Sequence, residues 1–186
     1  MRISDADILF IPGHGNSGPE HWQTRWEQKL STGRRVEQED WERPALAPWT
    51  RRIAEEAVAS HEAGRPVVLI AHSLGSLAVV HAAPLLGPAR IAGAYLITPP
   101  SDASVAALAD VDPAFVPAPM LPLPFPSLVV ASRTDPYGSL ADARSKAEAW
   151  GSTFVDAGDS GHINVASGHG PWPEGLMRLA TFLKTL

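Results

Sequence analysis

Short apolar runs alternate with helix-period segments along the whole chain, and this alternation constrains the fold most. Four runs are short, rich in Val, Ile and Leu, and bounded by Gly or Pro, as buried strands are. These strong strand candidates are residues 8–11, 66–71, 91–97 and 127–131, and weaker ones are residues 34–39 and 153–155. The pattern predicts an α/β fold, a mostly parallel central sheet with helices on both faces.

Three segments between or after these runs place their apolar residues on one helical face. The faces are Trp49, Ile53, Ala57 and Val58; Leu140, Ala143, Ala147 and Trp150; and Leu176, Leu179, Ala180 and Leu183. Ser139 is a suitable N-cap for the second helix, and Gly151 follows its last apolar residue.

Length, charge and cysteine content exclude several classes of protein. A chain of 186 residues with 45% hydrophobic residues is long enough for one domain, residues 1–186, with a core of its own. The absence of cysteine excludes disulfides and a thiol nucleophile. A net charge of −5 without a basic cluster argues against nucleic acid or an anionic membrane as partner.

The sequence also lacks a recognisable membrane or export segment. No run approaches the roughly 18 apolar residues that span a bilayer. Asp5 and Asp7 precede a short apolar run, which makes a poor signal peptide. We therefore expect a cytoplasmic protein.

Six prolines between residues 112 and 127 interrupt the alternation. Proline breaks both helices and sheet ladders, so this stretch is either a rigid extended connector or part of a rim above a site. The whole connection, residues 98–126, is long enough only for a minimal cap.

The strongest functional signal is the segment Ala71-His72-Ser73-Leu74-Gly75, which lies between a strand and a helix pattern. This is the context of the nucleophile elbow G-x-S-x-G, in which small flanking residues let a strained turn present its serine. Ala71 is a mild departure from the pattern. The alternative is an ordinary Ser N-cap. As nucleophile, Ser73 would have the Leu74 N–H as one oxyanion donor.

A serine nucleophile needs a base and an orienting acid, which in this fold follow in the order Ser, Asp or Glu, His. Asp135 lies just beyond a buried strand, and His162 lies in a Gly-rich turn after the last strand candidate. Asp156 and Asp159 are rival acids, less favoured because they are close to His162 in sequence. His169 is a rival base.

The first strand leads into Gly13-x-Gly15-x-x-Gly18, which matches the dinucleotide fingerprint G-x-G-x-x-G. Pro19 removes one of the amides such a site would offer to pyrophosphate, so we favour another use of these glycines. Backbone N–H groups of Gly13 or His14 would supply the second oxyanion donor. We therefore expect no cofactor. We also expect no metal, since no metal-ligand spacing occurs.

Two aromatic features are open to two interpretations. Trp22 and Trp26 are one helical turn apart, which favours packing over a substrate platform. Trp172 and His72 are candidates for the substrate pocket, although His72 is more simply structural. The other histidines, His14, His21, His61 and His81, are by default packed or solvated.

Four segments resemble the small serine hydrolases of the retinoblastoma-binding-protein-nine and YdeN-like family. They are PGHGNSGPEHWQTRWEQKL, AHSLGS, SRTDPYGS and GHINVASGHGPWPEG. The resemblance implies a compact α/β-hydrolase with Ser73 as nucleophile, Asp135 as triad acid and His162 as base. It also implies esterase or amide-hydrolase activity on small substrates, and some members act as binding proteins.

We therefore expect a carboxylesterase-like serine hydrolase that cleaves a small ester or amide through an acyl-enzyme. The alternative is a non-catalytic protein-binding module on the same fold. The sequence leaves the substrate, a protein partner and the oligomeric state open.

Overall fold

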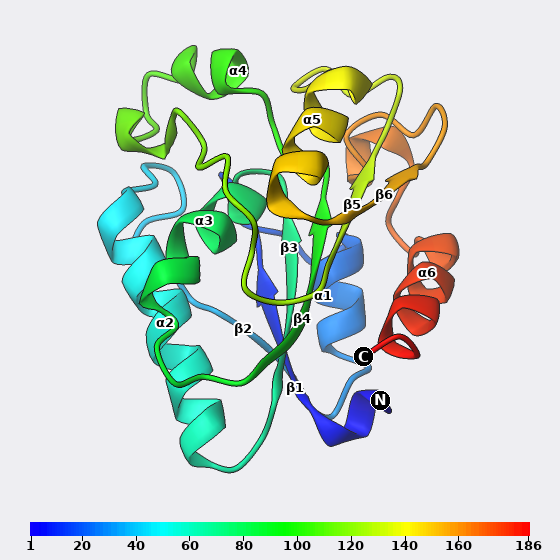
Figure 1. Cartoon of the computed structure of the whole chain (residues 1–186). Helices are drawn as coiled ribbons and strands as arrows, with labels where there is room; N and C mark the ends of the chain where they lie inside the picture. Colours follow the sequence, from blue (N-terminus) through cyan, green and yellow to red (C-terminus); the bar gives the residue numbers. More distant parts are fainter.

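Six parallel strands form one sheet in the computed structural model, which describes residues 1–186 (Figure 1). The strands are β1 (Asp7–Ile11), β2 (Gly33–Arg35), β3 (Val67–His72), β4 (Ile91–Ile97), β5 (Ser127–Ala131) and β6 (Thr153–Asp156). Their spatial order is β2-β1-β3-β4-β5-β6. The predicted α/β fold is confirmed, but β2 is shorter and begins earlier than the predicted strand 34–39.

Helices cover both faces of the sheet. They are α1 (Trp22–Glu27), α2 (Leu46–Glu62), α3 (Leu74–Ala82), α4 (Asp102–Ala106), α5 (Leu140–Trp150) and α6 (Pro173–Leu183). Short 3₁₀ helices occur at Ile3–Asp5, Ala83–Leu85, Pro113–Phe115 and Val165–Ser167. Side chains of α2, α3 and α5 form the core on one face, and those of α1 and α6 form the core on the other. None of the helices is both long and apolar enough to cross a membrane.

The helix predictions are accurate for α5 and partly wrong for α6. The Ser139 hydroxyl accepts a hydrogen bond from the Asp142 N–H at 3.1 Å, and Gly151 ends α5 with φ +67°. In α6, Leu176 and Ala180 are exposed, and the buried face is Gly175, Leu179, Phe182 and Leu183. Gly175 lies inward, where a Cβ atom would be 2.3 Å from the Trp172 ring, so the absence of a side chain lets the ring pack on this face of the helix.

The order of the strands creates a crevice between β1 and β3. After β1 the chain continues to β2 on one side of this pair, and after β3 it continues to β4 on the other side. The loops that follow β1 and β3 therefore run in opposite directions. In open parallel sheets, such a switch point at the carboxyl ends of the strands is the usual place for a ligand.

The proline-rich segment is a connector rather than a rim. Phe115 is fully buried in the core, and the Pro119 carbonyl accepts a hydrogen bond from Trp150 Nε1–H at 2.7 Å. The Leu123 N–H donates to the Trp150 carbonyl at 2.9 Å. Only the preceding part of the connection, which contains α4, lies at the crevice, so the cap is minimal (Figure 1).

Candidate active site

Ser73 occupies a strained turn between β3 and α3. Its φ of 55° and ψ of −129° lie outside the regions that non-glycine residues ordinarily adopt. A Cβ atom on Gly75 would lie 2.3 Å from the Ile11 carbonyl oxygen, and one on Gly13 would lie 2.9 Å from the Ser73 Cβ. The loop after β1 and the first turn of α3 therefore approach so closely that only glycine fits at both positions.

His162 and Asp135 form a buried hydrogen-bonded pair. His162 Nδ1 lies 2.9 Å from Asp135 Oδ1, and their side chains are 7% and 3% exposed. The same carboxylate oxygen accepts a hydrogen bond from the Tyr137 N–H at 2.9 Å. The Tyr137 ring also packs edge-on against the His162 ring, with centroids 4.6 Å apart. Asp135 is thus fixed by Tyr137 and in turn orients His162.

The rival residues lie elsewhere. Asp156 pairs with Arg133 at 2.9 Å, and its Oδ1 accepts a hydrogen bond from the Gly158 N–H, which helps to lower the pKa of its carboxyl. Asp159 is exposed. His169 Nδ1 contacts the Ser167 hydroxyl at 3.1 Å and does not line the cavity beside Ser73.

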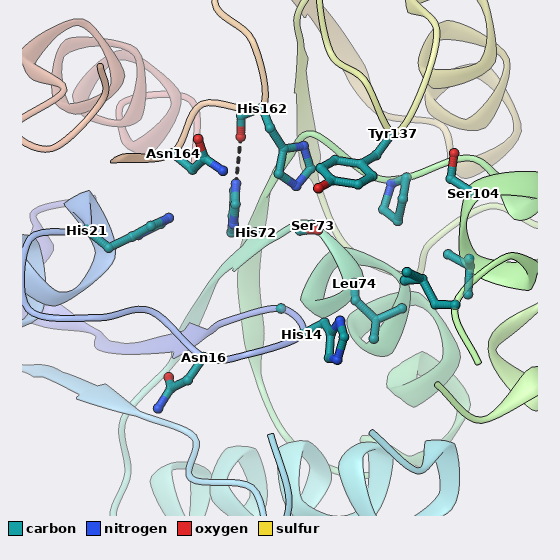
Figure 2. A pocket seen from close by; sticks show the side chains of 14 residues that line it. His14, Asn16, His21, His72, Ser73, Leu74, Ser104, Tyr137, His162 and Asn164 are labelled. Carbon is teal, nitrogen blue, oxygen red and sulfur yellow. Dashed lines mark hydrogen bonds between the residues drawn. The ribbon is translucent and has the colours of Figure 1, made fainter. Parts of the chain in front are cut away.

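Ser73 and His162 line one cavity of about 210 Å³ at the switch point (Figure 2). Most of its lining comes from the loops after β1, β3 and β4 and from the loop that carries His162. The full lining is Gly13, His14, Asn16, His21, His72, Ser73, Leu74, Pro100, Ser104, Val105, Leu108, Tyr137, His162 and Asn164. The structure therefore brings Ser73, Gly13, His14, Leu74, His72 and His162 together, with Asp135 bonded to His162.

His162 lies in a strained loop that other elements hold in place. Gly161 and Ile163, on either side of it, have φ of 54° and 46°, and a positive φ is a genuine outlier for a β-branched residue such as Ile163. The His162 carbonyl accepts hydrogen bonds from His72 Nε2–H at 2.9 Å and from the Thr98 hydroxyl at 3.4 Å. Trp22 Nε1–H donates to the Ile163 carbonyl at 2.8 Å.

These three donors show what the sequence could and could not reveal. His72 adjoins Ser73, and Trp22 lies one helical turn from Trp26, so the sequence indicates both residues for other reasons. Thr98 carried no signal beyond its place at the end of β4, although its φ of 46° marks it in the structure.

Three of the histidines that line the cavity have neighbouring rings. The ring centroid of His72 is 4.8 Å from that of His162 and 4.9 Å from that of His21. Burial holds the pKa of His72 well below its usual value. Burial, with the nearby charges of Arg35 and His162, lowers the pKa of His21 to about 4. Both rings are therefore neutral at pH 7, and neutral His72 donates from Nε2.

The structure does not place Trp172 in the cavity. It packs among Trp22, Trp26 and Tyr95 on the α1–α6 side of the sheet, with its ring stacked on that of Trp26 at 5.6 Å. Burial in the core removes more of this large apolar ring from water than a position in the loop beside the cavity would. Trp22 and Trp26 are core residues, as predicted. His21, in contrast, lines the cavity and caps α1.

The loop after β1 does not have the geometry of a dinucleotide fingerprint. In that motif the third glycine permits close packing of the helix on the strand. Here no atom lies within 4 Å of where a Cβ of Gly18 would be, and α1 begins only at Trp22. The close approach is instead between Gly13 and the turn at Ser73. No group of three or more His, Asp or Glu residues is arranged to hold a metal ion.

The model of the serine hydrolase family matches residues 8–181. The chain therefore belongs to the serine hydrolase family, and its fold is that of the α/β-hydrolases. A search of curated protein sequences gave no match.

Solved structures agree with this assignment. A protein described as a YdeN-like hydrolase from Pectobacterium atrosepticum is 34% identical, with a TM-score of 0.83, and the match covers 98% of this chain and 94% of that one. The ydeN gene product of B. subtilis is 18% identical, with a TM-score of 0.79 and coverage of 96% and 99%. The esterase domain of a Rhodothermus marinus protein is 16% identical, with a TM-score of 0.69 and coverage of 95% and 86%. The last two similarities concern the fold.

Proposed function

We propose that residues 1–186 form one hydrolase domain that cleaves a small carboxylic ester or amide through an acyl-enzyme. The observation that carries this proposal is the convergence of three residues at the switch point. Ser73 lies on a strained turn at a cavity that His162 also lines, and the buried carboxylate of Asp135 is bonded to the far nitrogen of His162. A serine hydroxyl is activated by a histidine base that a carboxylate orients, and we assign these roles to His162 and Asp135.

In the proposed reaction, Ser73 Oγ attacks the carbonyl carbon of the substrate and its proton passes to His162 Nε2. Asp135 keeps the Nδ1–H of His162 in place and stabilises the imidazolium. The bond to the leaving group then breaks, and His162 returns the proton to the departing alcohol or amine. Water attacks the acyl-enzyme with His162 again as base, which releases the acid and restores Ser73.

Backbone N–H groups are the proposed oxyanion donors. The Leu74 N–H lies at the start of α3, where the helix dipole also favours negative charge. A Cβ on Gly13 would lie 3.1 Å from the Leu74 nitrogen, so the Gly13–His14 loop is close enough to supply a second donor to the same oxygen.

The test is labelling with a fluorophosphonate probe, in which Ser73 Oγ bonds to phosphorus and fluoride leaves. We expect the label on Ser73 by mass spectrometry, none on Ser73→Ala, and labelling slowed about 10²- to 10⁴-fold in His162→Ala. His169→Ala is the matched histidine control and should label at the wild-type rate. Asp135→Asn should be labelled slowly, whereas Asp156→Asn should be labelled at the wild-type rate.

The alternative is a protein-binding module with no activated serine. A folded wild-type protein that takes no label on Ser73 would favour it. If labelling is slow in Asp156→Asn and normal in Asp135→Asn, the triad acid is Asp156 and not Asp135.

A further inference from the structure

The two sides of the cavity differ in polarity. On one side of Ser73 lie the side chains of His21, Asn16 and Asn164, and on the other lie Leu74 and Ser104 (Figure 2). The apolar part of the lining, here called the apolar wall, consists of Leu74 and of Pro100, Val105 and Leu108, which come from the same segment as Ser104. No Asp, Glu, Lys or Arg side chain lines the cavity.

One end of the apolar wall is fixed to the loop that contains Asp135. The Ser101 N–H donates to the Tyr137 carbonyl at 2.8 Å. Two backbone hydrogen bonds connect the following residues. The Val105 N–H donates to the Ser101 carbonyl at 3.1 Å, and the Leu108 N–H donates to the Val105 carbonyl at 3.0 Å. The position of the wall is therefore linked to that of the proposed triad acid.

The other side of α4 is tied to two further segments. Asp102 Oδ2 accepts a hydrogen bond from the Ala118 N–H at 3.3 Å. The buried ammonium of Lys146, on α5, lies 3.7 Å from Asp102 Oδ1 and 2.7 Å from Asp142 Oδ2. These contacts, together with those of Ser101, fix α4 and its Val105 against α5 and against the segments of Ala118 and Tyr137.

We propose that the apolar wall receives the acyl group and restricts the enzyme to short, uncharged acyl chains, with Val105 and Leu108 setting the upper length. This inference rests on the proposed function. The leaving group must receive its proton from His162, whose ring contacts those of His72 and Tyr137, with centroids 4.8 and 4.6 Å away. An apolar acyl chain is buried favourably only against the apolar part of the lining, so we infer that the acyl group extends toward Leu74.

Size and polarity both support short, neutral acyl groups. The cavity volume of about 210 Å³ is below the range of about 300–1,000 Å³ of sites for drug-sized ligands. A carboxylate on the acyl chain would be desolvated against the apolar wall without a cationic partner, which is unfavourable.

The first test measures kcat/KM of the wild type for p-nitrophenyl acetate, butyrate, hexanoate and octanoate. We expect the values to be highest for acetate or butyrate and to fall at least about tenfold from butyrate to hexanoate, since a filled apolar pocket discriminates by that much. The hemisuccinate, which carries a carboxylate, should also react at least about tenfold more slowly than butyrate.

The second test enlarges the pocket. Val105→Ala and Leu108→Ala should each raise the hexanoate-to-butyrate ratio of kcat/KM by at least about tenfold. Leu121→Ala is the matched control, because Leu121 is exposed in the same connection and lies outside the cavity, and its ratio should equal that of wild type.

Two results would overturn the inference alone. One is Ser73-dependent hydrolysis of octanoate as fast as of butyrate by the wild type, a measurement that needs no variant to fold. The other is an unchanged ratio in folded Val105→Ala and Leu108→Ala. If no ester is hydrolysed in a Ser73-dependent way and Ser73 takes no label, the proposed function fails as well.

Discussion

Replacing Gly75 with alanine should damage the active site through one methyl group. The added Cβ would lie 2.3 Å from the Ile11 carbonyl oxygen and 2.5 Å from the Pro12 carbonyl oxygen. Both are backbone atoms, so no side-chain rotation relieves the contact. Because close C···O contacts in proteins are about 3.3 Å, α3 must move roughly 1 Å away from β1.

The size of the effect follows from that displacement. Overpacking costs about 1–3 kcal/mol, and we expect Gly75→Ala near the upper end because the clash is with backbone. Ser73 and the Leu74 N–H move with the first turn of α3, away from Gly13. A misplacement of about 1 Å costs on the order of 10²-fold in rate, and we expect that loss in fluorophosphonate labelling.

Urea unfolding followed by tryptophan fluorescence measures the free energy of unfolding, and labelling kinetics measure the site. Gly18→Ala is the control, because its Cβ meets no atom within 4 Å and its φ is not positive. It should be neutral or stabilising by about 0.4–1 kcal/mol. The reasoning that this contact fixes Ser73 would be refuted by two results together. The free energy of unfolding of Gly75→Ala would lie within about 0.5 kcal/mol of the wild-type value, and the variant would be labelled at the wild-type rate.

Two further predictions concern the histidines. The pKa of His21 is about 4 in the folded protein against 6.5 normally, so the unfolded chain binds the proton first and stability falls as pH drops from 6.5 to 4. His21→Asn, which keeps an N-cap acceptor, should remove about 3 kcal/mol of that fall in urea unfolding at each pH; an unchanged pH dependence would contradict this. His72→Ala leaves the buried His162 carbonyl without its 2.9 Å donor and should cost about 1–3 kcal/mol and slow labelling. His72→Gln, which retains a donor, should recover part of both, and equal losses in the two variants would contradict a positioning role.

The sheet could be read from the sequence because strands covered on both faces appear as continuous apolar runs. All six residues of β3 are buried, and its predicted range, 66–71, differs from the observed one by a single position. β2 at the sheet edge has only half-buried residues, and its predicted range was wrong. The face of α6 was also misplaced, because periodicity alone does not show that Trp172 draws Gly175 inward.

The residues of the candidate site also fall into those that the sequence indicates and those that it does not. Local patterns indicated Ser73 and Gly13, because a strained turn and a close backbone approach need small residues at fixed spacing. The partners of His162 are different, since His72 and Thr98 reach its carbonyl from 90 and 64 positions away. No period or short motif encodes where loops from separate strands meet, so the sequence does not indicate Thr98 and predicts the wrong environment for Trp172.

Backbone strain is concentrated where these loops converge. Five non-glycine residues have positive φ. Asn16 and Ser73 line the cavity, Ile163 follows His162, and Thr98 donates to the His162 carbonyl. Such conformations cost of order 1–3 kcal/mol each and persist only where the surroundings fix them. Here the surroundings are hydrogen bonds between elements, such as that from Arg35 to Asn16 Oδ1 and that from Trp22 to the Ile163 carbonyl. The geometry proposed for catalysis therefore depends on donors from β2, α1 and β3 as much as on the residues that would react.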